Sequence, residues 1–159
     1  MNDKLPSPDA LLLHRIRWDY FVTLTHAPQG SPLVNPKIQI QSKRWHKYVR
    51  IICRTLKQHP RNVLWIKRWE VGRGGRDHFH VLMRLPSRCR RSVKSCVYRL
   101  ENIWKSKLEY GIADVRSIQG EDSIAGYIAK AVNDYEANRF SNERYRSVMF
   151  SSAAIRAMT

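Results

Sequence analysis

Two strand-like segments joined by a glycine-rich link constrain the fold of this chain more than any other feature. Residues 62–71 and 77–85 are rich in β-branched, aromatic and aliphatic side chains, as β-strands are. The link between them reads VGRGGRD and contains three glycines, which suits the turn of a hairpin. We therefore expect the two segments to pair as antiparallel strands.

The second of these strands carries His78 and His80 on either side of Phe79. Side chains two residues apart in a strand project from one face, roughly 6.6 Å apart at about 3.3 Å per residue. Antiparallel pairing can bring the carboxylate of Glu70, near the end of the first strand, onto that face. Two imidazoles and one carboxylate leave positions open for substrate, which suits a divalent cation.

A plainer interpretation of the same residues has to be weighed. Two histidines on alternate positions of a strand are also typical of an ordinary polar face, and Glu70 by itself resembles any surface charge. The rest of the chain has to decide between a metal site and a polar face.

The charge balance indicates the class of partner. The 159 residues include 29 Lys+Arg against 13 Asp+Glu, for a net charge of +16 at pH 7. Such an excess in a small domain is the footprint of a polyanion binder, most often of nucleic acid. The basic residues are spread over strands, loops and helices instead of one amphipathic helix, and no 18-residue apolar run is present. Nucleic acid is therefore the expected partner, and a membrane is not.

The length and the hydrophobic fraction of 43% predict one folded domain over residues 1–159. Its core is expected over about 18–138, followed by an irregular tail at 139–159. Three cysteines without framework spacing are expected to be reduced thiols in a cytosolic compartment.

The remaining periodicity completes a recognisable order of elements. It predicts a short helix at 8–15, a strand at 18–26, helices at 37–58 and 90–108, a strand at 112–118 and a third helix at 123–138. This β-α-β-β-α-β order predicts an α+β, ferredoxin-like antiparallel sheet with its two crossover helices on one face. The opposite face is expected to be free and to carry the two histidines and the glutamate.

Two further patterns have more than one interpretation. Tyr127 and Lys130 are three residues apart on the expected third helix and so are neighbours on one face, although tyrosines pack on helices in many proteins. Thr23 and Thr25 share one face of the first strand. Their hydroxyls could line a polar groove or merely follow the preference of β-branched residues for strands.

Taken in order, these pieces resemble the HUH endonucleases, which are named for a histidine–hydrophobic–histidine strand. They are most similar to the single-tyrosine rolling-circle replication initiators of small plasmids and phages. The N-terminal motif matches FVTLT, the metal strand matches HFHVLM, and the tyrosine helix matches GYIAK. The resemblance covers about residues 18–135.

The resemblance implies nicking and joining of single-stranded DNA. It implies Mn²⁺ or Mg²⁺ held by His78, His80 and Glu70, acting as a Lewis acid on the scissile phosphate. Tyr127 would attack and form a 5′-phosphotyrosine with a free 3′-OH, while Lys130 would lower the phenol's pKa or steady the phosphate.

The same resemblance gives expectations for DNA contacts and partners. Thr23, Thr25, Arg73 and Arg76 are expected to contact DNA. The substrate would be a single-stranded origin or hairpin nick site in the cytoplasm of a bacterial host or a phage-infected cell. No helicase domain follows the expected core, so a host helicase and polymerase are expected to complete replication.

Three alternatives remain open at this point. Initiators with two tyrosines usually carry them four residues apart, but position 131 is alanine, so a single nucleophile is favoured over participation of Tyr135. A single-tyrosine transposase would share the metal strand and the tyrosine helix. A non-catalytic module that binds single-stranded nucleic acid would share the charge and the topology.

Overall fold

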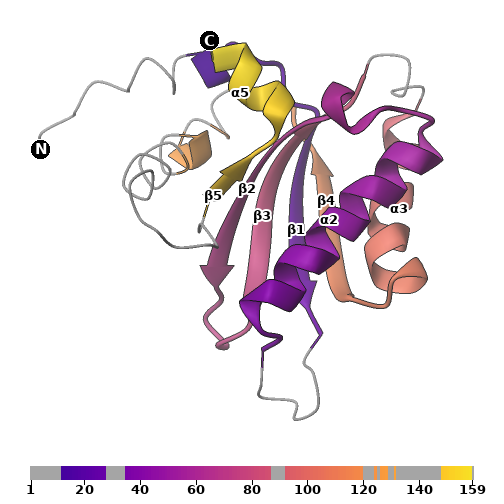
Figure 1. Cartoon of the computed structure of the whole chain (residues 1–159), viewed down its shortest axis with the longest axis vertical. Coiled ribbons are helices and arrows are strands. Elements are labelled where there is room, and N and C mark those ends of the chain that lie inside the picture. The colour runs from indigo at the N-terminus through magenta and orange to yellow at the C-terminus, as the bar shows by residue number, and fades with distance from the viewer. Residues whose placement is uncertain are drawn as a thin grey trace, which may run out of the picture.

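A five-stranded antiparallel sheet in the order β4-β1-β3-β2-β5 forms the centre of the molecule (Figure 1). The computed structural model describes residues 12–27, 35–86, 92–119, 124, 126–128, 131 and 148–158. The first four strands have the order and the antiparallel pairing of a ferredoxin-like sheet, because the β2–β3 hairpin is inserted beside β1. The predicted α+β class and central antiparallel sheet are confirmed.

The expected strands and both crossover helices are present, with ends that differ by a few residues from the expected ones. The strands are β1 (Tyr20–His26), β2 (Leu64–Val71), β3 (Asp77–Arg84), β4 (Gly111–Ser117) and β5 (Val148–Phe150). The helical elements are α2 (Ile38–Thr55), the 3₁₀ turn η1 (Pro60–Asn62), α3 (Val93–Asn102), the π-helical turn η3 (Ile103–Lys107) and α5 (Ser152–Met158).

Helices α2 and α3 lie on one face of the sheet and form the main core with it (Figure 1). Buried positions recur every three or four residues along α2, and alternate residues of β1 point to the same core. Aromatic rings fill its centre: the ring of Trp45 lies 6.2 Å from that of Phe79, and Tyr48 packs edge-on against Trp104 at 5.4 Å. This core orients the sheet so that its other face is available for the site.

The expectation that the other face is wholly free is wrong for about half of it. Ile66 of β2 and Leu82 of β3 are fully buried on the face that also carries the histidines. Apolar side chains there require cover, and a second cluster supplies it. Its members are Leu13, Ile16, Trp18, Ile66, Leu82, Ile124, Ile128, Ala131, Phe150 and Ala154. The half of this face nearer the β2–β3 turn carries the half-buried His78 and His80 instead.

The expectation of an irregular tail is also wrong, because β5 and α5 lie within residues 139–159. In β5, Phe150 pairs with Ile66 and so extends the sheet by one strand. The Ser151 hydroxyl accepts hydrogen bonds from the backbone N–H groups of Trp65 and Ala154 at 3.0 and 3.1 Å, which fixes the start of α5.

Two expected helices lie partly outside the described residues. Of the helix expected at 8–15, residues 12–14 are helical and 8–11 are not described. Of the helix expected at 123–138, residues 124, 126–128 and 131 are helical and the others are not described.

The main core encloses a lysine. Lys67 is 3% exposed, and its Nζ lies 4.0 Å from the centroid of the Phe79 ring. Burial lowers the pKa of Lys67 from 10.5 to about 7. Between those two pH values the unfolded chain binds a proton that the folded chain does not, so this lysine makes the protein more stable as pH rises from about 7 to 10.5.

We expect Lys67→Met to stabilise the protein at pH 7 by about 1–3 kcal/mol, because it removes a buried polar group of similar length. The advantage should shrink towards about pH 9, since the wild-type lysine is then mostly neutral. Urea unfolding of both proteins at the two pH values measures this. A methionine variant that is less stable at pH 7 would mean that the contact with the Phe79 ring outweighs the cost of burial.

Candidate active site

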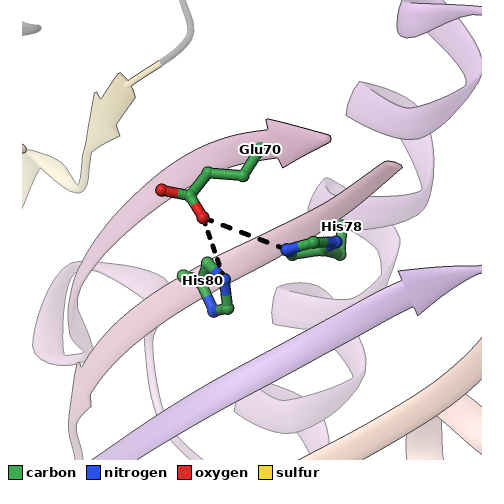
Figure 2. Close-up of side chains that lie close together, drawn as sticks. All are labelled: Glu70, His78 and His80. Atoms are coloured by element: carbon green, nitrogen blue, oxygen red, sulfur yellow. Dashed lines mark ion pairs between the residues drawn. The ribbon is translucent and has the colours of Figure 1, made fainter. Parts of the chain in front are cut away.

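The strand register brings the three sequence-predicted metal ligands together. Glu70 of β2 lies directly opposite His78 of β3, and His80 follows on the same face. The Oε2 atom of Glu70 lies 3.2 Å from Nε2 of His80 and 4.0 Å from Nε2 of His78 (Figure 2). One ligand atom from each of the three half-buried side chains lies within 4.8 Å of the other two.

These separations fit a divalent cation. Bonds of about 2.0–2.2 Å put two ligand atoms of one ion within roughly 4.4 Å of each other. Both glutamate–histidine separations already meet that limit. The two imidazoles, at no more than 4.8 Å, need only a small ring rotation. The site can therefore hold a metal ion by three protein ligands with further positions left for substrate.

The environment of His78 fixes which ring nitrogen faces the site. Its Nδ1 lies 3.3 Å from the backbone carbonyl oxygen of Arg76, which can only accept a hydrogen bond. A neutral His78 therefore carries its proton on Nδ1 and directs the Nε2 lone pair toward Glu70 and His80. This is the usual way in which a second hydrogen bond prepares a histidine ligand.

The environment of His80 allows it to bind with or without an ion. Its Nδ1 lies 3.2 Å from the Thr23 hydroxyl, which can donate or accept, so either tautomer of the ring is satisfied. Burial, and then the charges of His78 and Arg68, lower the pKa of His80 to about 4. The ring is thus neutral at neutral pH, which is the form that ligates metals. Phe21 stacks on it at a centroid distance of 5.5 Å.

Arg68 belongs to the site and was missed by the sequence analysis. It lies opposite His80 in the β2–β3 register and forms an ion pair with the Oε1 atom of Glu70. The other oxygen of Glu70 is left facing the two imidazoles. Arg68 precedes Glu70 by two residues, so the strand alternation that joined the histidines could also have identified it.

The hairpin that carries His78 is anchored to the segment that begins α2. Asn35 donates to the Gly75 carbonyl at 2.8 Å and accepts from the Asp77 N–H at 3.0 Å. Buried Gln41 donates to the Asp77 carboxylate at 2.5 Å. These contacts, between residues about 40 positions apart, fix the start of β3 immediately before the first histidine.

Tyr127 lies on the same face of the sheet as the ligand set. Its hydroxyl donates a 2.6 Å hydrogen bond to the backbone carbonyl of His80. Its ring meets Phe21 edge-on at 5.4 Å, and Phe21 in turn stacks on the His80 imidazole. Burial raises the pKa of Tyr127, against a smaller opposing effect of Arg68. The tyrosine helix therefore docks beside the strand that carries both histidines.

A comparison with protein families decides what kind of protein this is. A family model for replication-associated proteins of the ORF2 type matches residues 19–136. The chain belongs to this replication-associated protein family. No curated protein and no solved structure matches the chain significantly.

The family match includes every element of the site. It runs from the start of β1 through the β2–β3 hairpin to the tyrosine helix, and so contains Thr23, Glu70, both histidines and Tyr127. Membership of the replication-associated protein family indicates a role in DNA replication and DNA as the partner. Among the described residues, no helix is long and apolar enough to cross a membrane.

The other sequence-predicted residues of this family member are placed as follows. Thr25 is half-buried in the row of His78, opposite it across β1 and β3. Arg73 and Arg76 are exposed in the β2–β3 turn. Lys130 lies outside the described residues.

Gly72 offers a test of the site that removes no ligand. A Cβ atom there would lie 2.9 Å from Cε1 and 3.2 Å from Nδ1 of His78, so the ring would have to move. A Cβ atom on Gly74, in the same turn, would meet nothing within 4 Å.

We therefore expect Gly72→Ala to weaken Mn²⁺ binding about tenfold, as displaced supporting groups of metal ligands do. Gly74→Ala should bind Mn²⁺ like the wild type. Calorimetric titration of the three proteins with Mn²⁺ measures the affinities. Equal affinities for all three would show that His78 is not held as a ligand in this position.

Proposed function

We propose that this protein is a metal-dependent HUH endonuclease that nicks and rejoins single-stranded DNA through a phosphotyrosine, as an initiator of rolling-circle replication. One observation carries the proposal. The hydroxyl of Tyr127 rests on the backbone of His80, on the sheet face where three metal-ligating atoms converge. Membership of a replication-associated family and the net charge of +16 support the same role.

Each residue of the site has a task in this proposal. His78, His80 and Glu70 hold a Mn²⁺ or Mg²⁺ ion, which when bound would withdraw charge from a nonbridging oxygen of the scissile phosphate. Thr23 keeps the His80 ring oriented through its 3.2 Å contact. Arg68, beside the ligands, supplies a fixed positive charge for the phosphate.

The chemical step exchanges one phosphodiester for another. The Tyr127 oxygen forms a bond to phosphorus while the bond from phosphorus to the 3′-oxygen breaks. The phenolic proton is lost and the leaving 3′-oxygen gains one, so the products are a 5′-phosphotyrosine and a 3′-OH. Because bond types are conserved, the reverse attack by a 3′-OH rejoins the strand and frees the tyrosine.

The hydroxyl of Tyr127 must change partners for this step. Its hydrogen bond to the His80 carbonyl and its burial both favour the neutral phenol. Binding of DNA therefore has to draw the hydroxyl from that carbonyl to the phosphate. Lys130, three residues further along, is proposed to assist there, and Thr25, Arg73 and Arg76 to contact the strand on either side.

Tyr127→Phe removes only the hydroxyl and tests the proposal directly. We expect it to abolish the covalent protein–DNA adduct that the wild type forms with single-stranded oligonucleotides in the presence of Mn²⁺. Mn²⁺ affinity should be unchanged, because no ligand is touched. Denaturing gels detect the adduct, and calorimetry measures the metal.

Tyr98→Phe is the matched control, since Tyr98 is 68% exposed on α3, away from the site. It should form adduct at the wild-type level. DNA found on Tyr135 by mass spectrometry of the adduct peptide would contradict the assignment of the nucleophile. Tight DNA binding by the wild type without any adduct would instead favour a non-catalytic binding module.

A further inference from the structure

A basic groove lies on the part of the molecule that the proposed chemistry does not use. It has a volume of about 490 Å³ and lies between α2, η1 and the start of α5. Its lining residues are His46, Val49, Arg50, His59, Pro60, Arg61, Trp65, Ser151 and Ser152. We call it the α2–η1 groove.

The polar lining of the α2–η1 groove has one sign of charge. His46 and Arg50 come from α2, and His59 and Arg61 from the η1 segment, and all four are exposed. Within the described part of the chain, no carboxylate lines the groove and neither arginine forms an ion pair with one. Partial burial and then the charges of Lys67 and Arg50 lower the pKa of His46, as expected in a positive potential.

The cations of the α2–η1 groove are held by specific contacts. Nδ1 of His59 accepts hydrogen bonds from the backbone N–H and from Nε of Arg61, at 3.2 and 3.1 Å. A neutral His59 therefore carries its proton on Nε2 and offers a second donor. The guanidinium of Arg156 in α5 donates to the Arg61 carbonyl at 3.2 Å, which brings a third arginine beside the groove. An anion would thus meet donors from three separate segments.

This groove is distinct from the candidate metal centre. Trp65 in its floor and Glu70 at the metal centre lie on the same strand, five residues or roughly 17 Å apart at about 3.3 Å per residue. Trp65 belongs to the core under α2, whereas Glu70 faces the opposite side of the sheet. A short DNA segment bound at the metal does not have to reach the groove.

The chemistry of the lining selects the kind of ligand. Arginine forks and imidazole donors match phosphate oxygens. The apolar floor offers little stacking surface for a base, because Trp65 is only 7% exposed. Contacts of this kind hold the nucleic-acid backbone without reading sequence.

We propose that the α2–η1 groove binds the phosphodiester backbone of DNA outside the stretch that is cut. That DNA is the ligand follows from the family; only the words "outside the stretch that is cut" rest on the proposed function. The groove would hold the replicon while the metal centre acts, and it would do so without metal.

The test compares two double variants that each remove two positive charges from the protein. Arg50→Ala/Arg61→Ala removes both arginines that line the groove. Lys43→Ala/Lys47→Ala removes two exposed lysines of α2 that do not line it. Binding is measured with EDTA at several salt concentrations between about 50 and 200 mM, separately for a long single strand and for a duplex. Thermal unfolding checks that each variant is folded.

We expect the arginine variant to lose about tenfold in affinity and to lower the slope of log K against log[salt] by about 1.4–1.8, the value for two phosphate contacts. The lysine variant should lose far less. The DNA form that shows the difference identifies whether the groove takes single strands or duplex. Equal losses in the two variants, or no loss with either DNA form, would overturn the proposal.

Adduct formation with a short oligonucleotide at saturating concentration separates this proposal from the proposed function. The arginine variant should form adduct like the wild type. If the wild type forms no adduct, the nicking function fails, while a selective loss of binding in the arginine variant would still establish the groove. If adduct forms normally and binding is unaltered, the groove proposal alone is wrong.

Discussion

The pairing register of β2 and β3 is the constraint on which the site depends. It sets Glu70 opposite His78, and a slip of one residue would move the glutamate to the other face of the sheet. Buried side chains on both strands resist such a slip, since Ile66 and Leu82 have to stay on the covered part of their face. The contact between Gln41 and Asp77 adds a fixed point next to the turn.

The second face of the sheet is divided between packing and chemistry. Its covered half holds the tyrosine helix through Ile124 and Ile128, and this packing delivers the Tyr127 hydroxyl to the backbone of His80. Its other half presents the ligand set beside Arg68. A nucleophile and a metal site on different segments are thus brought to one strand by ordinary apolar burial. The charge that retains DNA can then lie elsewhere, as the α2–η1 groove illustrates.

The sequence predicted the parts of this arrangement that follow from local periodicity. Strand alternation and the glycine-rich link were enough to place both histidines and Glu70 on one face, and the order of elements was enough for the sheet. The parts that were missed depend on contacts distant in sequence: the stacking of Phe21 on His80, and the cover over the second face. The β5–α5 segment was missed because a three-residue strand and a seven-residue helix are too short to show a period.

The central claim is that three side chains of the β2–β3 hairpin form a metal centre, and crystals soaked in Mn²⁺ test it most directly. Anomalous scattering locates the ion independently of any assumption about activity. We expect one strong peak within bonding distance of Nε2 of His78, Nε2 of His80 and a carboxylate oxygen of Glu70. No peak at this position, or an ion bound through Nδ1 of His78, would contradict the claim.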